Sequence, residues 1–224
     1  MMPARVLQLP VVLIAVLLLS GCMGLLAPLV PERSSPDERL ALFEQRLQRL
    51  DALERWRVSG RLGVVTEDDR VGLTLNWRQL APGLWRVNLS GPLATGSVRL
   101  DGGRDGVLMR TSRGDEYRSD DARALLRRET GVDLPAEALT HWLQGRPVGG
   151  ATAADTLELD AAGRLVRLEQ YGWTLVYSDY RVAGGVDLEV PYRVEASGEG
   201  VRIRVLVERW DVPDTAADAE AVAQ

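Results

Sequence analysis

Residues 56–100 alternate between apolar and polar side chains, with interruptions at 67–69, 81–83 and 91–96. Successive side chains of a β-strand point to opposite faces of a sheet, so a period of two predicts strands with one apolar and one polar face. The interruptions contain Asp, Pro and Gly, which are common in tight turns. The sequence therefore predicts four consecutive antiparallel strands in this region.

The rest of the chain predicts further strands and three helices. Strands are expected at 107–111, 156–159, 165–170, 173–177, 192–195 and 201–210. Two of the helices are expected at 120–130 and from Pro135 to just before Gly145, because Gly often follows the end of a helix. About ten strands and three helices suggest a mainly β protein: a strongly curved antiparallel sheet with helices across its concave side.

The first helix is expected to begin after Ser35, which forms a capping box with Glu38. Its apolar residues recur at helical spacing and form one stripe: Leu40, Phe43, Leu47 and Leu50. Such a stripe packs on a protein core or lies on a membrane surface. The polar face carries charges of both signs, which favours core packing.

The apolar faces of the predicted sheet and helices either fill a solid core or line a cavity for an apolar ligand; spacing alone does not separate the two. The candidate lining residues are large and apolar: Trp56, Val58, Leu62, Leu73, Leu75, Trp77, Trp85, Val87, Leu139, Trp142, Leu143 and Trp173.

The turn Gly91-Pro92-Leu93 places a large apolar residue at the tip of a loop between two strands. An exposed Leu forgoes about 1.5–3 kcal/mol of burial. Leu93 therefore either folds back onto a core or is held out to contact a membrane or an acyl chain. The second alternative makes Gly91, Pro92 and Leu93 a candidate membrane-insertion loop.

The N-terminal segment predicts a lipoprotein signal peptide over residues 1–21. Arg5 precedes a short apolar stretch, and Leu19-Ser20-Gly21-Cys22 resembles the bacterial lipobox, whose Cys is acylated and becomes the mature N-terminus. An uncleaved anchor is the alternative, but Gly and Pro residues interrupt the apolar run. Met23 resembles the outer-membrane sorting class. Residues 22–34 are then a linker from the lipidated Cys22.

Composition excludes several functions. A net charge of −5 argues against nucleic acid as a partner. Every basic residue is Arg, so no Lys-dependent chemistry is possible, and a single Cys forbids a Cys-cluster metal site. The only histidine, His141, lies in a predicted helix and suits its surface better than a role as a base. We expect no catalytic residues, no metal and no cofactor.

Six short motifs carry a resemblance to a known family. They are RVSGR at 57–61, NWRQ at 76–79, LSGPL at 89–93, GVDLP at 131–135, LTHWLQG at 139–145 and WTLVY at 173–177. Their order, together with the lipobox at Cys22, resembles the LolB family of outer-membrane lipoproteins. The resemblance covers nearly the whole mature chain and implies an incomplete, unclosed antiparallel β-barrel of ten or eleven strands, with a helical lid over an apolar cavity.

The same resemblance implies a function and partners. The family accepts acylated lipoproteins from the soluble periplasmic carrier LolA and inserts them into the outer membrane. Its protruding loop carries an apolar residue, usually Leu after Pro, that insertion requires; Leu93 matches it, although Ala94 stands where Gly is common. We expect a monomer on the periplasmic face of the outer membrane. A structural or assembly lipoprotein, or a carrier of free lipid, is the alternative.

The predicted boundaries follow from these elements. Residues 35–212 form the LolB-like lipoprotein-binding domain, and residues 213–224 form an acidic, Ala-rich, disordered tail. Since the sequence has no nucleotide-binding motif, transfer of a lipoprotein would have to follow a gradient of affinity, with about 1.4 kcal/mol for each tenfold step.

Overall fold

The computed structural model describes residues 34–91, 96–130, 133 and 135–213. Eleven strands form one antiparallel sheet. They are β1 (Trp56–Val65), β2 (Arg70–Ala81), β3 (Leu84–Ser90), β4 (Ser97–Gly103), β5 (Gly106–Thr111), β6 (Glu116–Ser119), β7 (Thr156–Leu159), β8 (Leu165–Gln170), β9 (Trp173–Val182), β10 (Glu189–Gly198) and β11 (Val201–Asp211). The helices are α2 (Pro36–Asp51), α3 (Ala122–Thr130), α4 (Ala136–Leu143) and the short 3₁₀ turn η2 (Ala151–Ala153).

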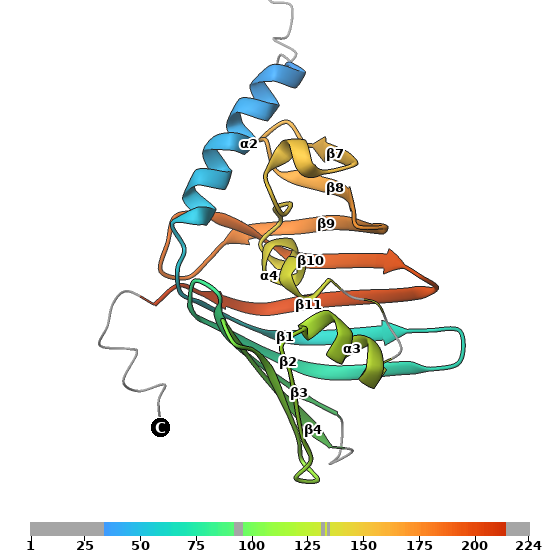
Figure 1. The fold of residues 1–224 in the computed structure, drawn as a ribbon. Coiled ribbons are helices and arrows are strands. Elements are labelled where there is room, and N and C mark those ends of the chain that lie inside the picture. The colour runs from blue at the N-terminus through green and yellow to red at the C-terminus, as the bar shows by residue number, and fades with distance from the viewer. Residues whose placement is uncertain (1–33, 92–95, 131–132, 134, 214–224) are drawn as a thin grey trace, which may run out of the picture. The chain divides into compact units, whose positions relative to one another are not determined.

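The order of strands in the sheet is β6-β5-β4-β3-β2-β1-β11-β10-β9-β8-β7. Strands β1 to β6 step outward to one edge, and β7 to β11 step back from the other, so that β11 pairs with β1 (Figure 1). Within the described residues no pairing joins the edge strands β6 and β7. The sheet is therefore an unclosed antiparallel barrel of eleven strands, as the resemblance to the LolB family implied.

Helix α2 begins as expected and lies beside the end of the sheet that carries β7 and β8 (Figure 1). The Ser35 hydroxyl accepts a hydrogen bond from the Glu38 amide at 3.2 Å, and the Glu38 carboxylate accepts one from the Ser35 amide at 2.7 Å. Phe43 and Leu50 are fully buried, which confirms that the stripe faces a core. The prediction was wrong for Leu40, which is 39% exposed near the beginning of the helix.

Arg46 takes the buried place on α2 that the pattern did not predict. Its guanidinium donates a hydrogen bond to the Glu189 carbonyl and lies 5.1 Å from the centre of the Tyr180 ring. Burial lowers the pKa of Arg46; Tyr180 and Glu189 oppose this change, whereas the positive charges of Arg164 and Arg49 add to it. The hydrogen bond and the ring contact attach α2 to β9 and β10 through a polar group rather than through another Leu.

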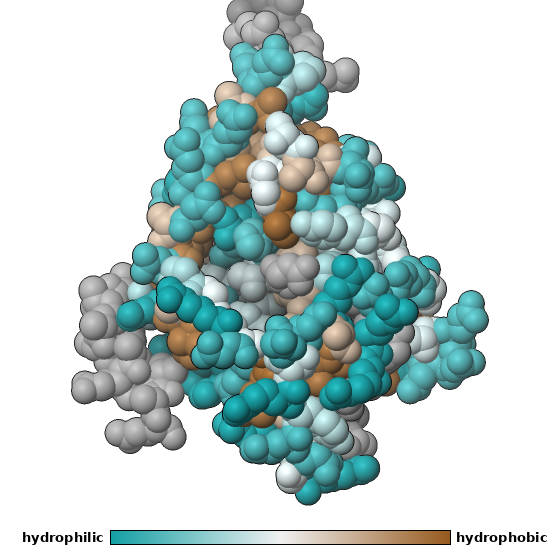
Figure 2. Space-filling model, in the orientation of Figure 1, coloured by the Kyte–Doolittle hydropathy of each residue, from teal (hydrophilic) through white to brown (hydrophobic). Residues whose placement is uncertain are grey.

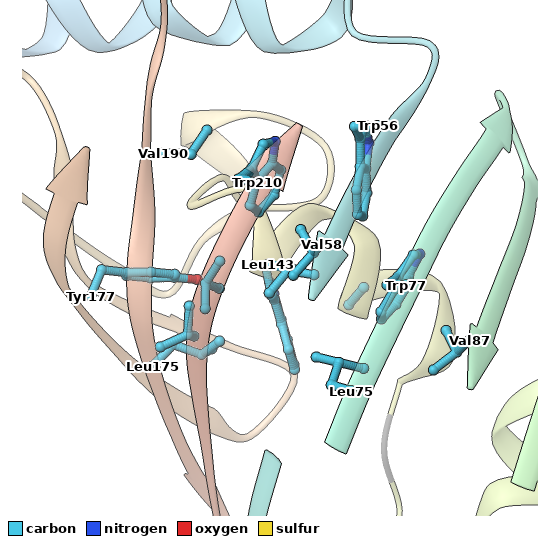
Figure 3. Close-up of a cluster of buried hydrophobic side chains, with 14 of the residues drawn as sticks. Trp56, Val58, Leu75, Trp77, Val87, Leu143, Leu175, Tyr177, Val190 and Trp210 are labelled. Atoms are coloured by element: carbon cyan, nitrogen blue, oxygen red, sulfur yellow. The ribbon is translucent and has the colours of Figure 1, made fainter. Parts of the chain in front are cut away.

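The core contains a row of tryptophans that crosses neighbouring strands on the inner face of the sheet (Figure 3). The ring of Trp56 stacks on that of Trp210 with centroids 5.1 Å apart, and the Trp77 ring lies 5.9 Å from Trp56. Trp85 continues the row 5.8 Å from Trp77. Pairs in this geometry stabilise a core by about 0.5–1.5 kcal/mol beyond the burial of their area.

The sequence patterns missed one strand and shortened two others. Strand β6 has a single large apolar residue, Tyr117, so no alternation marks it. Strand β9 continues to Val182, and β10 begins at Glu189, because backbone pairing in their hairpin extends to Tyr180 with Pro191, Arg181 with Val190 and Val182 with Glu189. Strand β11 ends at Asp211, and residues 214–224 of the predicted tail lie outside the described residues.

Candidate apolar ligand site

A cavity of about 260 Å³ lies between the inner face of the sheet and the helices α3 and α4. Every side chain on its wall is apolar. The wall consists of Leu62, Val64, Leu73, Leu75, Trp77, Trp85, Val87, Leu89, Leu100, Val107, Ala122, Leu125, Leu126, Ala136, Leu139, Trp142, Leu143, Leu175, Val194, Ala196, Val201, Ile203 and Val205. Apart from the indole N–H groups of its tryptophans, such a wall offers no partner to a buried polar or charged group, so it suits hydrocarbon.

Nine of the twelve candidate residues lie on this wall: Leu62, Leu73, Leu75, Trp77, Trp85, Val87, Leu139, Trp142 and Leu143. They come from β1, β2, β3 and α4, which are separate in the sequence. The outward-facing residues between them, such as Thr74 and Asn76, are exposed. The alternation therefore predicts the six residues on β1, β2 and β3 that share one face of the sheet, and the helical spacing on α4 adds Leu139, Trp142 and Leu143.

Trp56, Val58 and Trp173 lie in solid packing beside the cavity. All three are at most 2% exposed. Val58 stands opposite Trp210 on one side and Trp77 on the other, so two indole rings fill the space around it. Trp56 packs into the same row, as Figure 3 shows. At this end of β1 large aromatic rings leave no room for a ligand.

The candidate set omitted much of the wall. Val201, Ile203 and Val205 on β11 alternate with Arg202 and Arg204 in the same way as residues of β1. This signal was present in the sequence, but nothing local shows that β11 pairs with β1. Leu125 and Leu126 lie in the helix that the sequence predicts over 120–130, but nothing in that segment shows which surface the helix covers.

Helix α4 is attached to the sheet through buried polar contacts. The Trp142 indole donates a hydrogen bond of 3.1 Å to the Gln170 side-chain oxygen, and Gln170 is 2% exposed. The same oxygen accepts from the Val148 amide, and the Gln170 amide nitrogen donates to the carbonyls of Val148 and Ala153 at 2.9 and 3.1 Å. One side chain of β8 thus fixes both α4 and the loop that follows it.

Helix α3 is attached differently. Arg123 donates two hydrogen bonds to the Asp133 carboxylate, at 2.5 and 2.6 Å, on the outer side of the helix. The hydrogen bonds from Arg123 lower the pKa of Asp133. The Asp133 carbonyl in turn accepts a hydrogen bond of 3.4 Å from the Trp173 indole. Figure 2 shows the face that bears these helices: mostly polar residues, with apolar patches between them.

No titratable side chain lines the part of the cavity wall that the structure describes. Tyr177, behind the wall, is fully enclosed; burial raises the pKa of its hydroxyl, which stays protonated. His141 is half-buried on α4. Within the described ranges no group of His, Cys, Asp or Glu side chains could hold a metal ion, and no helix is long and apolar enough to cross a membrane.

The predicted insertion loop and lipidation site lie mostly outside the described residues. Pro92, Leu93 and Cys22 are not described. Gly91, which is described, donates a backbone hydrogen bond of 3.0 Å to the carbonyl of Gly96, so the two ends of the loop meet directly after β3 and before β4.

An unclosed antiparallel barrel with an apolar interior beneath two short helices defines a class of protein whose interior suits apolar ligands. The family model described as Outer membrane lipoprotein LolB matches residues 54–210. The outer-membrane lipoprotein LolB of Halorhodospira halophila is 38% identical over 202 residues, covering 90% of this chain and 94% of that protein. The LolB of Alkalilimnicola ehrlichii is 37% identical over 199 residues, 89% of this chain and 94% of that protein. The chain belongs to the LolB family.

A solved structure supports the fold independently. A LolA superfamily protein from Nitrosomonas europaea superimposes with a TM-score of 0.51 over 80% of this chain and 94% of that chain, at 10% sequence identity. At that identity the likeness concerns the fold alone. The fold is therefore shared with a protein whose sequence has almost no similarity to this one.

Proposed function

We propose that this protein is an outer-membrane lipoprotein receptor that takes acylated lipoproteins from LolA and inserts them into the outer membrane. One observation carries the proposal: the cavity between the sheet and its helices has a wall made only of apolar side chains. Membership of the LolB family supports the proposal that this cavity holds the acyl chains of lipoproteins. We expect the protein to be a monomer without catalytic activity.

The proposed position of the protein depends on Cys22. Residues 1–21 are the signal peptide, and residues 22–34 connect the acylated Cys22 to the domain that begins at Ser35. Each buried methylene of an acyl chain contributes about 0.8 kcal/mol, so several chains hold the protein in the outer membrane almost permanently. Mass spectrometry of the membrane-extracted protein should find an acylated Cys22 as the first residue; an intact Met1 would contradict this.

The lipoprotein moves toward the site where its acyl chains are buried most completely. In this proposal acyl chains pass from the carrier into a cavity lined by hydrocarbon and then into the bilayer, where their burial is more complete. Leu93 enters the bilayer and opens the way for the last step. Leu93 makes the tip of the loop apolar. The described ends of this loop are held together by the hydrogen bond between Gly91 and Gly96.

The cavity is tested by ligand displacement. An environment-sensitive dye should bind the protein and be displaced by an acylated peptide but not by the same peptide without its acyl chain. Leu139→Gln places an amide on the cavity wall and should weaken dye binding. Thr140→Gln, one residue further along α4 and off the wall, is the matched control. No displacement by the acylated peptide would favour a structural lipoprotein over a receptor.

The loop is tested by a two-step transfer assay. Leu93→Glu should still accept lipoprotein from LolA but fail to release it into outer-membrane vesicles, because burying a carboxylate in hydrocarbon is costly. Leu93→Met keeps an apolar tip and should release normally. We expect the melting temperature of Leu93→Glu to stay close to that of the unaltered protein. A large drop would mean that Leu93 packs in the core, and normal release would remove it from the mechanism.

A further inference from the structure

Two glycines stand directly opposite each other on the outer face of the sheet. Gly63 of β1 pairs with Gly72 of β2, in the interior of both strands. A Cβ atom at Gly72 would meet nothing within 4 Å, and one at Gly63 would meet only the Arg204 carbonyl oxygen at 4.0 Å. Neither residue has a positive φ. Packing and backbone geometry therefore do not require glycine here, although glycine weakens a strand.

At other positions in the sheet, close contacts with neighbouring atoms explain why glycine is present. A Cβ atom at Gly102 would lie 2.1 Å from the Trp85 ring, and one at Gly60 would lie 2.2 Å from the Leu206 carbonyl oxygen. A glycine inside a strand with open space above it marks a place where another molecule can approach the backbone closely. The pair Gly63–Gly72 fits that description.

The pair forms the floor of a groove of about 310 Å³. Arginine side chains line one side of this groove, and hydroxyl-bearing side chains line the other. Arg61 and Arg204 flank it on β1 and β11, and Thr74 and Ser90 stand opposite each other on β2 and β3. Leu62, Leu73 and Leu206 complete the lining.

The two arginines can reach one ligand. Gly63 is the register partner of Arg204, and Arg61 is two residues away along β1. Such diagonal positions are about 7–8 Å apart, well within the span of two Arg side chains. Arg61 contacts Glu208 and Arg204 contacts Glu195, each at 3.0 Å, in solvent-exposed ion pairs. A guanidinium has five donors, so an exposed carboxylate does not use them all.

The lining of the groove ends directly before the proposed insertion loop begins in the sequence. Its lining ends at Ser90, the last residue of β3, and Leu93 follows three residues later. Three residues span at most about 10–11 Å. The headgroup layer of a bilayer leaflet is about 5–8 Å thick. If Leu93 reaches the acyl chains, the groove therefore lies at or next to the depth of the lipid phosphates.

We infer that the groove over Gly63 and Gly72 binds the phosphate of a phospholipid headgroup. Arg61 and Arg204 donate charge-assisted hydrogen bonds to the phosphate oxygens, and the hydroxyls of Thr74 and Ser90 donate from the other side. The glycine floor lets the headgroup lie against the backbone. With a net charge of −5 the protein has no general attraction to anionic lipid, so this contact is local.

The placement of the groove at the membrane rests on the proposed function, so the test measures lipid contact without LolA or cargo. Full-length lipidated protein is reconstituted in phosphatidylcholine vesicles that contain phosphatidylglycerol, a trace of which carries a photoactivatable headgroup. After illumination, labelled peptides are mapped. Label should fall on residues 61–63 and 72–74. Replacing both Arg61 and Arg204 by Gln should reduce this label by about tenfold or more.

Matched variants separate the groove from general effects. Gly72→Val fills the floor at a position where an added Cβ atom meets nothing within 4 Å, so label should fall while the melting temperature holds or rises. Asn76→Val places the same side chain on the same face, outside the groove, and should keep the label. Arg209→Gln removes one charge from β11, also outside the groove, and should keep it as well.

Each outcome is decisive. Equal labelling of the double Arg variant and the unaltered protein would overturn the inference. Loss of the label on adding millimolar inorganic phosphate would identify a site for free phosphate and overturn the assignment to lipid. Normal lipoprotein transfer without any label in the groove would refute the groove and leave the proposed function standing. Label in the groove without transfer would refute the proposed function and leave the groove.

Discussion

Replacing Gln170 by Leu tests whether buried hydrogen bonds hold helix α4 over the cavity. The side chain accepts from the Trp142 indole and the Val148 amide and donates to the carbonyls of Val148 and Ala153. Leu leaves the buried indole without a partner, at a cost of about 1–3 kcal/mol, and removes three half-buried bonds of about 0.5–1.5 kcal/mol each. Better burial of Leu offsets part of this loss, so the free energy of unfolding should fall by about 3–5 kcal/mol.

Urea denaturation measures this loss, and a double-mutant cycle assigns it. Trp142→Phe removes the indole N–H and keeps an aromatic ring on the cavity wall. If the hydrogen bond matters, the double variant should be less destabilised than the sum of the two single variants, by about 1 kcal/mol. A loss below about 1 kcal/mol for Gln170→Leu, or strict additivity in the cycle, would refute the view that Gln170 holds α4 in place.

Three further predictions concern the lid, the sheet and the cavity. The Arg123 contact lowers the pKa of Asp133, so its stabilisation is complete above the ordinary carboxyl pKa of about 4 and is lost as the pH falls through the lowered value. Urea unfolding of the protein and of Asp133→Asn should therefore differ at neutral pH and converge in acid. Gly102→Ala would place a methyl group 2.1 Å from the Trp85 ring and should destabilise the domain by about 1–3 kcal/mol in urea, whereas a neutral result would show that the ring can move. Ala196→Phe fills space on the cavity wall and should weaken dye binding several-fold with little change in melting temperature; unchanged dye binding would place the ligand elsewhere.

The sequence predicts the strands well where the evidence is local. The alternation in residues 56–100 places Leu62, Leu75 and Val87 on one face, because the direction of a side chain depends only on its place in the strand. The alternation of apolar and polar residues does not predict strand β6, because a short edge strand needs no apolar face, only backbone pairing with β5. On α2 the helical spacing also predicts the buried face, but it does not predict the burial of Arg46. Arg46 is buried because its guanidinium contacts a ring on β9 and a backbone carbonyl on β10.

The distinction between cavity and core is not local. Val58 and Leu62 lie on the same face of β1, and both are apolar, but only Leu62 lines the cavity. The difference comes from Trp210, which stands opposite Val58 only because β11 returns to pair with β1. A pattern of residues predicts which face is buried, whereas the sizes of side chains brought from distant strands decide whether that face is filled.

The pairing of β1 with β11 has a consequence for how the chain is made. A polypeptide that emerges N-terminus first presents β1 long before Val201–Asp211 exists to cover its edge. Until then β1 to β6 form half a sheet, and an open apolar edge at β1 invites pairing with other chains. We therefore expect the nascent protein to need protection from such pairing until its last strand is present. A truncation before Val201 leaves two half-sheets with no strand pairing to join them.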